Sequence, residues 1–276
     1  PCGYSGICSN GKMLLLSTVC RKNGGDIIYT STDSGESWKI IMNGLEYSRF
    51  DWNIPYMKPA YNGGGNCVHW ISDIKLSPFD SDTALFNTGT GLFMITGLAS
   101  GDVLIKPFCE GIEETVHLNV YTTSHGRNRI IDIIGDLGGF AFKDYDSECE
   151  NSFANEKGDR YITCLNADLT LSDPEYIVAT PRGNWTGKTK GGLILSKDCG
   201  STWERLPMPR GLSEFIDQKL DNIEKPNVDS GWAAISADGK RIMWAVAGGR
   251  GFSNKAVCYT DNEGKTWQKS IFMDSS

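Results

Sequence analysis

The sequence has no apolar run that could span a bilayer. Its longest mainly apolar run, residues 13–19, is far shorter than the roughly 20 residues that a transmembrane helix requires. We therefore expect a buried strand there. No signal peptide is recognisable, and the first residue is Pro1 rather than Met. We expect the chain to begin partway through a longer gene product, or to have been processed.

Patterns for metal binding are also missing. The nine cysteines include no CxxC pair, and the three histidines, His69, His117 and His125, form no cluster with them at zinc spacing. We therefore expect no metal site and no cofactor. Because the number of cysteines is odd, at least one thiol has no partner in the chain. The count fits both buried free cysteines and a partial set of disulfides.

Positive charge is scarce. Lys and Arg number 27 against 34 Asp and Glu, which makes the formal net charge −7, and the acidic residues are scattered. A nucleic acid or an anionic membrane would require a basic patch, so neither is expected as a partner. A neutral polymer such as a polysaccharide is compatible with this surface. With 39% hydrophobic and 22% charged residues, the chain is expected to be globular.

Three segments share the pattern S/T-x-D/N-x-G-x-S/T-W, known as the Asp box. They are residues 31–38 (STDSGESW), 196–203 (SKDCGSTW) and 260–267 (TDNEGKTW). In such a turn the Asp or Asn side chain accepts hydrogen bonds from nearby backbone N–H groups, and the glycine adopts a positive φ. Each box lies between β-rich runs, so we expect it in a hairpin. We expect Trp38, Trp203 and Trp267 to be core residues.

The boxes predict an all-β fold of Asp-box β-propeller blades. At roughly 40–50 residues per blade, the interval between Asp33 and Asp198 holds about three blades, and the chain about five. We expect one incomplete propeller region over residues 1–276. Long insertions are expected at about 43–68 and 144–159, and loops of that length on a propeller usually belong to the binding face.

Short β-branched or aromatic runs bounded by turn residues predict the strands. They are residues 12–19, 26–30, 69–76, 84–88, 91–96, 117–122, 130–134, 160–165, 176–180, 192–195, 233–236, 241–246 and 255–259. Only the brief segment 213–222 is predicted to be helical.

Four short motifs carry a family resemblance. They are residues 70–82 (WISDIKLSPFDSD), 85–91 (LFNTGTG), 111–115 (GIEET) and 134–140 (IGDLGGF). Their order, together with the first box and the later segment 236–239 (SADG), resembles glycoside hydrolase family 74, in the part that carries the signature of the second propeller. The resemblance covers most of the chain.

The resemblance implies an activity. Members of that family are mostly secreted, endo-acting xyloglucanases that act on plant cell-wall polysaccharide. They are built from two seven-bladed propellers, and the glucan lies in the cleft between them. They invert the anomeric configuration with one aspartate from each propeller. The motif G-D-x-x-G-F places the second-propeller aspartate, the general acid, at Asp136.

The catalytic base is expected to be missing. In the family it lies in a T-D-x-G-G turn near the start of the first propeller, and no segment of this chain matches that turn. Five blades also cannot form both propellers. We therefore expect the chain to need the missing propeller of its parent and to be inactive alone.

General chemistry agrees with the assignment of Asp136. Inversion requires a protonated carboxyl that donates to the leaving oxygen and a carboxylate roughly 6.5–9.5 Å away that activates water. A turn flanked by glycines after the strand at 130–134 leaves room for a sugar. Apolar neighbours would raise the pKa of the acid. The alternative is that Asp136 only caps a tight turn.

Several further residues are candidates for substrate binding. The aromatic residues in or beside the first insertion can stack on sugar rings or simply pack: Trp52, Tyr56, Tyr61 and Trp70. Asp73 is expected either to line the cleft or to satisfy backbone donors. Glu113 and Glu114 are expected to orient the loop beneath Asp136 or to contact sugar. Phe140 ends the motif that contains Asp136.

Two other functions remain open. A sialidase also uses Asp boxes, but it needs three convergent arginines, and no Arg-Ile-Pro precedes the first box. A non-catalytic propeller that binds glycans or proteins would need no exposed acid. A buried, fully capped Asp136 would favour that alternative, whereas an open groove lined by Trp52 or Trp70 would favour the hydrolase.

Overall fold

The computed structural model describes residues 3–20, 25–43, 49–57, 68–149, 152–183, 189–209, 231–246 and 257–273. Within these ranges every regular element is a β-strand, which confirms the all-β prediction. None of the described segments forms a helix long and apolar enough to cross a membrane. The helix predicted at 213–222 and the candidate residue Tyr61 lie outside the described residues.

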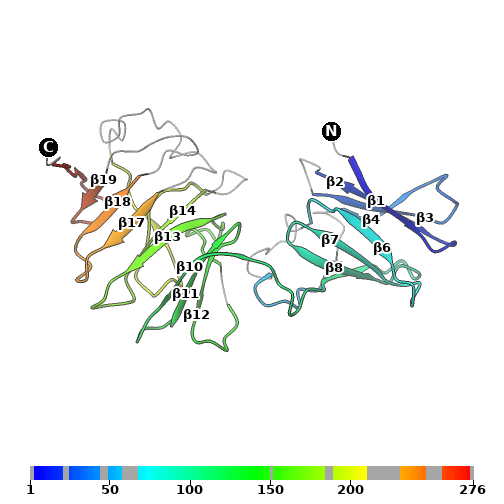
Figure 1. Cartoon of the computed structure of the whole chain (residues 1–276), viewed down its shortest axis with the longest axis horizontal. Coiled ribbons are helices and arrows are strands. Elements are labelled where there is room, and N and C mark those ends of the chain that lie inside the picture. Colours follow the sequence, from blue (N-terminus) through cyan, green and yellow to red (C-terminus); the bar gives the residue numbers. More distant parts are fainter. Residues whose placement is uncertain are drawn as a thin grey trace. The chain divides into compact units, whose positions relative to one another are not determined.

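The described strands form five sheets, in agreement with the predicted number of blades. Within each sheet, neighbouring strands follow one another along the chain and pair antiparallel (Figure 1). The one exception among the described strands is β5, which joins β9 in parallel. The chain consists of two compact units, Pro1–Glu114 and Thr115–Ser276.

The first unit contains two sheets. One consists of β1 (Gly3–Ser9), β2 (Leu14–Val19), β3 (Ile27–Ser31) and β4 (Lys39–Asn43). The other has the order β5-β9-β8-β7-β6. Its strands are β5 (Arg49–Phe50), β6 (Asp73–Leu76), β7 (Ala84–Thr88), β8 (Gly91–Thr96) and β9 (Leu104–Pro107). Strands β1 and β2 contact β6, so the two sheets pack against each other.

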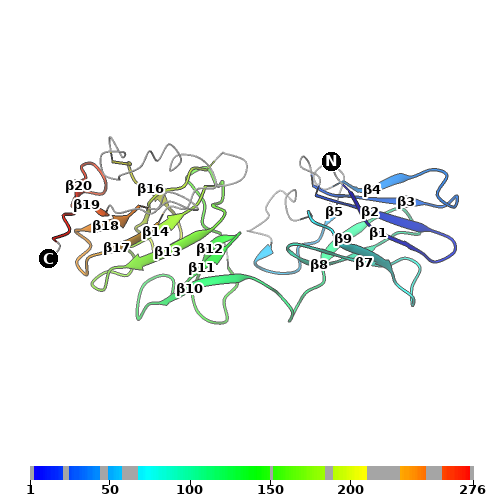
Figure 2. The same ribbon diagram turned by 45° about the horizontal axis from the view of Figure 1, so that its top comes forward.

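The described part of the second unit contains three sheets, and all of their strands except β15 are labelled in Figure 1 or Figure 2. The first consists of β10 (Val116–Thr122), β11 (Ile130–Gly135) and β12 (Gly138–Phe142). The second consists of β13 (Cys164–Leu169), β14 (Ile177–Pro181), β15 (Ile194–Ser196) and β16 (Glu204–Arg205). The third consists of β17 (Trp232–Ile235), β18 (Ile242–Ala245), β19 (Val257–Thr260) and β20 (Gln268–Lys269).

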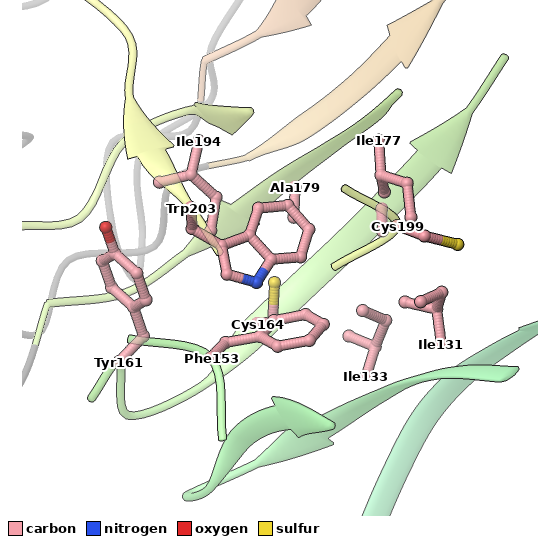
Figure 3. Close-up of a cluster of buried hydrophobic side chains, with 11 residues drawn as sticks. Ile131, Ile133, Phe153, Tyr161, Cys164, Ile177, Ala179, Ile194, Cys199 and Trp203 are labelled. Carbon is pink, nitrogen blue, oxygen red and sulfur yellow. The ribbon is translucent and has the colours of Figure 1, made fainter. Parts of the chain in front are cut away.

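Two apolar cores hold the second unit together. One lies between the β10–β12 sheet and the β13–β16 sheet, where Ile131 and Ile133 meet Ile177 and Trp203 (Figure 3). The other lies between the β13–β16 sheet and the β17–β20 sheet and contains Trp244. Alternate residues of each strand face these cores, which is the pattern that stacked sheets require.

The Asp-box turns have the expected hydrogen bonds. In the first, Asp33 accepts from the N–H of Ser37 at 2.9 Å and from the Ser31 hydroxyl at 2.7 Å. Gly35 has a φ of 91°. The corresponding bonds are present around Asp198 and around Asn262.

The box tryptophans correct one expectation. Trp203 is buried between two sheets, as predicted, with an exposed fraction of 4%. Trp267 is half-buried against the core that contains Trp244. Trp38 is also half-buried. Trp203 and Trp267 each pack toward the sheet that comes before their own in the chain. No described sheet precedes that of Trp38, which is the first in the chain.

The second predicted insertion is more than a surface loop. Phe153, in the segment 144–159, is 2% exposed and packs in the core against Trp203. The strand predicted at 160–165 begins only at Cys164, because Tyr161 and Thr163 instead bond to neighbouring loops. The first insertion is described only in part.

The described cysteines are free thiols: Cys8, Cys20, Cys109, Cys149, Cys164, Cys199 and Cys258. Five of these seven are buried. Burial raises the pKa of the Cys164 thiol to about 12 and that of Cys258 to about 12. Thiols of this kind are unreactive and act as small apolar groups.

Candidate functional site

Asp136 lies in the tight turn between β11 and β12. Its φ is 62°, in the left-handed region that few residues other than glycine adopt. The residue is exposed, and the described residues contribute no hydrogen bond to its carboxylate. The side chain therefore does not cap the turn. The structure does not support the alternative in which Asp136 is buried and capped.

The backbone of Asp136 is held by the segment before the next sheet. Its N–H donates to the Thr163 hydroxyl at 2.9 Å. Its carbonyl accepts from the Arg160 guanidinium at 2.8 Å. Gly138 also forms a parallel bridge with Thr163. These contacts fix the direction of the turn, and thereby of the carboxylate, without engaging the carboxylate itself.

The two glycines after the turn are required by close approach of other segments. A Cβ at Gly138, whose φ is 82°, would lie 2.8 Å from the carbonyl oxygen of Tyr161. A Cβ at Gly139 would lie 2.6 Å from the carbonyl oxygen of Asp132 and 2.8 Å from the Phe153 ring. The glycines of the motif thus allow Phe153 and Tyr161 to pack directly on β12.

Asp136 lies at one end of its sheet, and the other end contacts the Asp box at residues 196–203. The turn that leads into β11 is bonded to that box, because the Asn128 amide donates to the Cys199 carbonyl at 2.7 Å. Strand β11 then runs from Ile130 to Gly135, and Asp136 follows it directly. A polar hollow at the box end is lined by Tyr176, Asp238 and Glu263, among others, and includes no residue of the Asp136 turn.

A chain of three polar side chains lies beside this turn. Register pairs Val116 of β10 with Gly135 of β11, which places Thr115 level with Asp136. The Thr115 hydroxyl is 2.6 Å from Nε2 of His117, and Nδ1 of His117 is 2.9 Å from the Asp132 carboxylate. Asp132 is buried, and this burial raises the pKa of its carboxyl, an effect that the hydrogen bond to His117 opposes.

Phe140 is placed differently from the prediction. It is 2% exposed and contacts Phe142 edge to face, at 6.2 Å between ring centroids. Its backbone pairs with Asp132 on one side and Ser152 on the other. This burial is at odds with a direct sugar contact and makes Phe140 a packing residue of β12.

In the first unit, Trp70 is the most exposed of the described candidate aromatic residues. Its backbone φ is 60°, in the left-handed region, and the residue is 59% exposed. The ring lies over Gly89, where a Cβ would come within 3.1 Å of it. A flat, exposed and positioned indole of this kind is suited to stacking on a sugar.

Trp52 and Tyr56 are half-buried. Trp52 stacks on Phe50 at 4.9 Å with nearly parallel rings. Burial raises the pKa of the Tyr56 hydroxyl, and the nearby Cys109 and Glu113 raise it further. Tyr56 therefore remains neutral and can donate a hydrogen bond at any ordinary pH.

The candidate carboxylates of the first unit have local roles. Asp73 accepts from the N–H of Ile74 at 2.8 Å and from Lys75 at 2.6 Å, so it satisfies local donors, the second of the two expected roles. The Lys75 hydrogen bond lowers the pKa of Asp73. Glu113 accepts from the N–H of Gly111 at 2.8 Å and orders its own loop. Glu114 is exposed.

Among the described residues, no group of three His, Cys, Asp or Glu side chains comes together as a metal site.

The residues that surround Asp136 were not predicted. Thr163 and Arg160 reach it from a different sheet segment, and Asp132 is far from His117 in the sequence. Strand alternation from Asp132 to Ile134 would have been the one usable signal, since it places a carboxylate on an otherwise apolar face.

Curated relatives cover nearly the whole chain. A xyloglucanase from a Paenibacillus species is 24% identical over 288 residues, covering 97% of this chain and 26% of that protein. An oligoxyloglucan-reducing end-specific xyloglucanase from Emericella nidulans is 25% identical and covers 89% of this chain and 33% of that protein. The chain thus spans about a quarter to a third of these relatives. No model of a known protein family matches the sequence.

Solved structures share the fold. The GH74 xyloglucanase from Xanthomonas campestris has a TM-score of 0.71 at 23% identity, covering 95% of this chain and 33% of that one. The GH74 enzyme from Niastella koreensis has a TM-score of 0.71 at 19% identity, covering 96% and 34%. The resemblance of this chain to part of a glycoside hydrolase family 74 protein is therefore confirmed.

Proposed function

We propose that the chain is part of an inverting xyloglucan hydrolase and that Asp136 is its general acid. The observation that carries this proposal is the free, exposed carboxylate of Asp136 on a strained turn that neighbouring loops hold in place. Backbone strain that the surroundings maintain is typical of functional positions. The position within the motif and the xyloglucanase relatives supply the reaction.

The direct test uses the full-length protein that contains this chain. Asp136→Asn keeps the shape of the side chain but removes its ability to donate a proton. We expect it to lower the release of reducing ends from xyloglucan by about 10²–10⁴-fold, the usual contribution of a general acid. Asp146→Asn, at an exposed position in the loop after β12, is the matched control. Near-normal turnover by Asp136→Asn would refute the assignment.

The isolated chain is expected to bind but not to hydrolyse. An inverting mechanism needs a second carboxylate for the water, and the proposal assigns that group to another part of the parent protein. Hydrolysis of xyloglucan by the 276-residue chain alone would contradict this division. The anomer first released by the parent enzyme, read by proton NMR, tests inversion separately, because a retained β-anomer would exclude it.

Trp70 is proposed to stack on the polysaccharide. It is exposed and its ring lies against Gly89, unlike the buried Trp203. We expect Trp70→Ala to weaken binding of the chain to xyloglucan without lowering its unfolding midpoint. Unchanged binding would show that the ring only covers Gly89. The extracellular location that the resemblance implies stays a prediction.

A further inference from the structure

The Thr115–His117–Asp132 chain is built by strand register beside Asp136. On β10 and β11, His117 pairs with Ile134 and Val120 pairs with Asp132. A β-bulge between His117 and Asn119 shifts the register there. Bulges re-aim side chains and are frequent next to active sites. Here the bulge brings the imidazole over the Asp132 carboxylate.

Burying Asp132 is costly for the fold. Its side chain is 10% exposed, whereas that of His117 is 53% exposed. Among the described residues, the hydrogen-bond partner of the Asp132 carboxylate is His117. A pair of apolar side chains at these positions would often be more stable than a buried charge with a single partner. The Asp132–His117 pair is therefore better explained by the role that Asp132 gives to the ring nitrogens of His117 than by a contribution to stability.

The arrangement sets the roles of the ring nitrogens. When Asp132 is ionised its carboxylate can only accept, so Nδ1 of His117 donates to it. The Thr115 hydroxyl lies 2.6 Å from Nε2, which accepts from it when the ring carries its one proton on Nδ1. The lone pairs of Thr115 Oγ1 remain able to accept from a ligand.

We infer that Thr115 and His117 form a binding site for a sugar hydroxyl next to Asp136. This inference rests on the proposed function, because the sugar would be the one that Asp136 acts on. A sugar hydroxyl fits the site because it can donate to Oγ1 of Thr115. It can also displace the Thr115 hydroxyl and donate to Nε2 of His117. An anion does not fit, since the site lies beside the carboxylates of Asp132 and Asp136.

The test is an NMR titration of the whole chain with a xyloglucan oligosaccharide. The chain has three histidines, so the imidazole signals are few, and the His117→Gln variant assigns that of His117. We expect the His117 signal to shift saturably over oligosaccharide concentrations up to about 10 mM, a range that covers weak binding. The absence of a saturable shift would overturn the inference.

His125 is the internal control. Its Nδ1 lies 2.9 Å from the Ser124 hydroxyl, but it has no buried carboxylate partner among the described residues, and it lies in the turn at the other end of the sheet. Its signal is expected to stay in place. Equal shifts at His117 and His125 would indicate a general solvent effect and would also overturn the inference.

Substitutions at Thr115 separate binding from structure. Thr115→Val keeps the shape but removes the hydroxyl, and we expect it to weaken binding about 3–10-fold, the effect of one hydrogen bond. Thr115→Ser is expected to restore binding. Equal affinity in both variants and the unaltered chain would contradict a role for this hydroxyl.

The same titration with Asp136→Asn distinguishes this inference from the proposed function. We expect the His117 shift to persist, because the Asp136 carboxylate is not one of the proposed ligands. A persistent shift supports the sugar site even if Asp136 proves not to be the acid. Conversely, a missing His117 shift leaves the turnover test of Asp136 intact.

Discussion

The N–H of Asp136 donates to the hydroxyl of Thr163 at 2.9 Å, so the proposed acid is held by the residue before the first strand of the next sheet. Thr163 is 7% exposed. Thr163→Val would leave this N–H without its acceptor, and we expect it to lower the free energy of unfolding by about 1–2 kcal/mol. Thr163→Ser should lose much less. Urea unfolding of both variants measures this, and equal losses would show that packing dominates.

The backbone conformation of Asp136 predicts a separation of stability from activity. At a φ of 62°, a side chain costs roughly 1 kcal/mol that glycine avoids, although glycine loses more chain entropy on folding. We therefore expect Asp136→Gly to change the free energy of unfolding by less than about 1 kcal/mol. In the full-length protein the same change should abolish hydrolysis.

Asp136→Val is the matched comparison. A β-branched residue is strongly disfavoured in the left-handed region, so this variant should unfold at a clearly lower urea concentration than Asp136→Gly. If both variants were equally stable, the turn would have relaxed to another conformation, and the strain argued for this site would be absent.

Gly139 is expected to tolerate no side chain. The Cβ of Gly139→Ala would overlap the backbone of Asp132 and the ring of Phe153, and the backbone cannot move aside cheaply. We expect a loss of about 1–3 kcal/mol in the free energy of unfolding, as for an overpacked core. Gly3→Ala on β1 is the control, because its Cβ would meet only Val19, at 3.5 Å. Similar losses in both would indicate a general effect of alanine in strands.

Local patterns in the sequence predicted much of the architecture. The Asp boxes close their hydrogen bonds within a few residues, so the motif alone is sufficient to predict the turn. Strands β7 and β8 were predicted because their β-branched and aromatic residues form short continuous runs. Strands β1 and β12 were not predicted, because each contains two glycines where a strand normally has side chains.

The site was predictable only in its central residue. The motif predicted that Asp136 follows a strand in a tight turn, and the structure confirms that position. Its supports depend on which segments the fold brings together: Thr163 comes from another sheet segment, and His117 meets Asp132 through a bulge. The same holds for Phe140, whose burial follows from the approach of Ser152. No local pattern contains this information.

The first Asp box has Asp33 where the third has Asn262, and this predicts a difference in acid sensitivity. Hydrogen bonds from Ser37 and Ser31 lower the pKa of Asp33, so its contribution to stability is present above the unfolded value of about 4 and is lost as pH falls below it. Asn262 accepts the same backbone bond, from Thr266 at 2.8 Å, and does not titrate. We therefore expect Asp33→Asn to fold normally and to flatten the fall in melting temperature between about pH 4 and pH 2, whereas Asp33→Ala should melt lower at every pH. An unchanged acid profile in Asp33→Asn would show that other carboxylates control it.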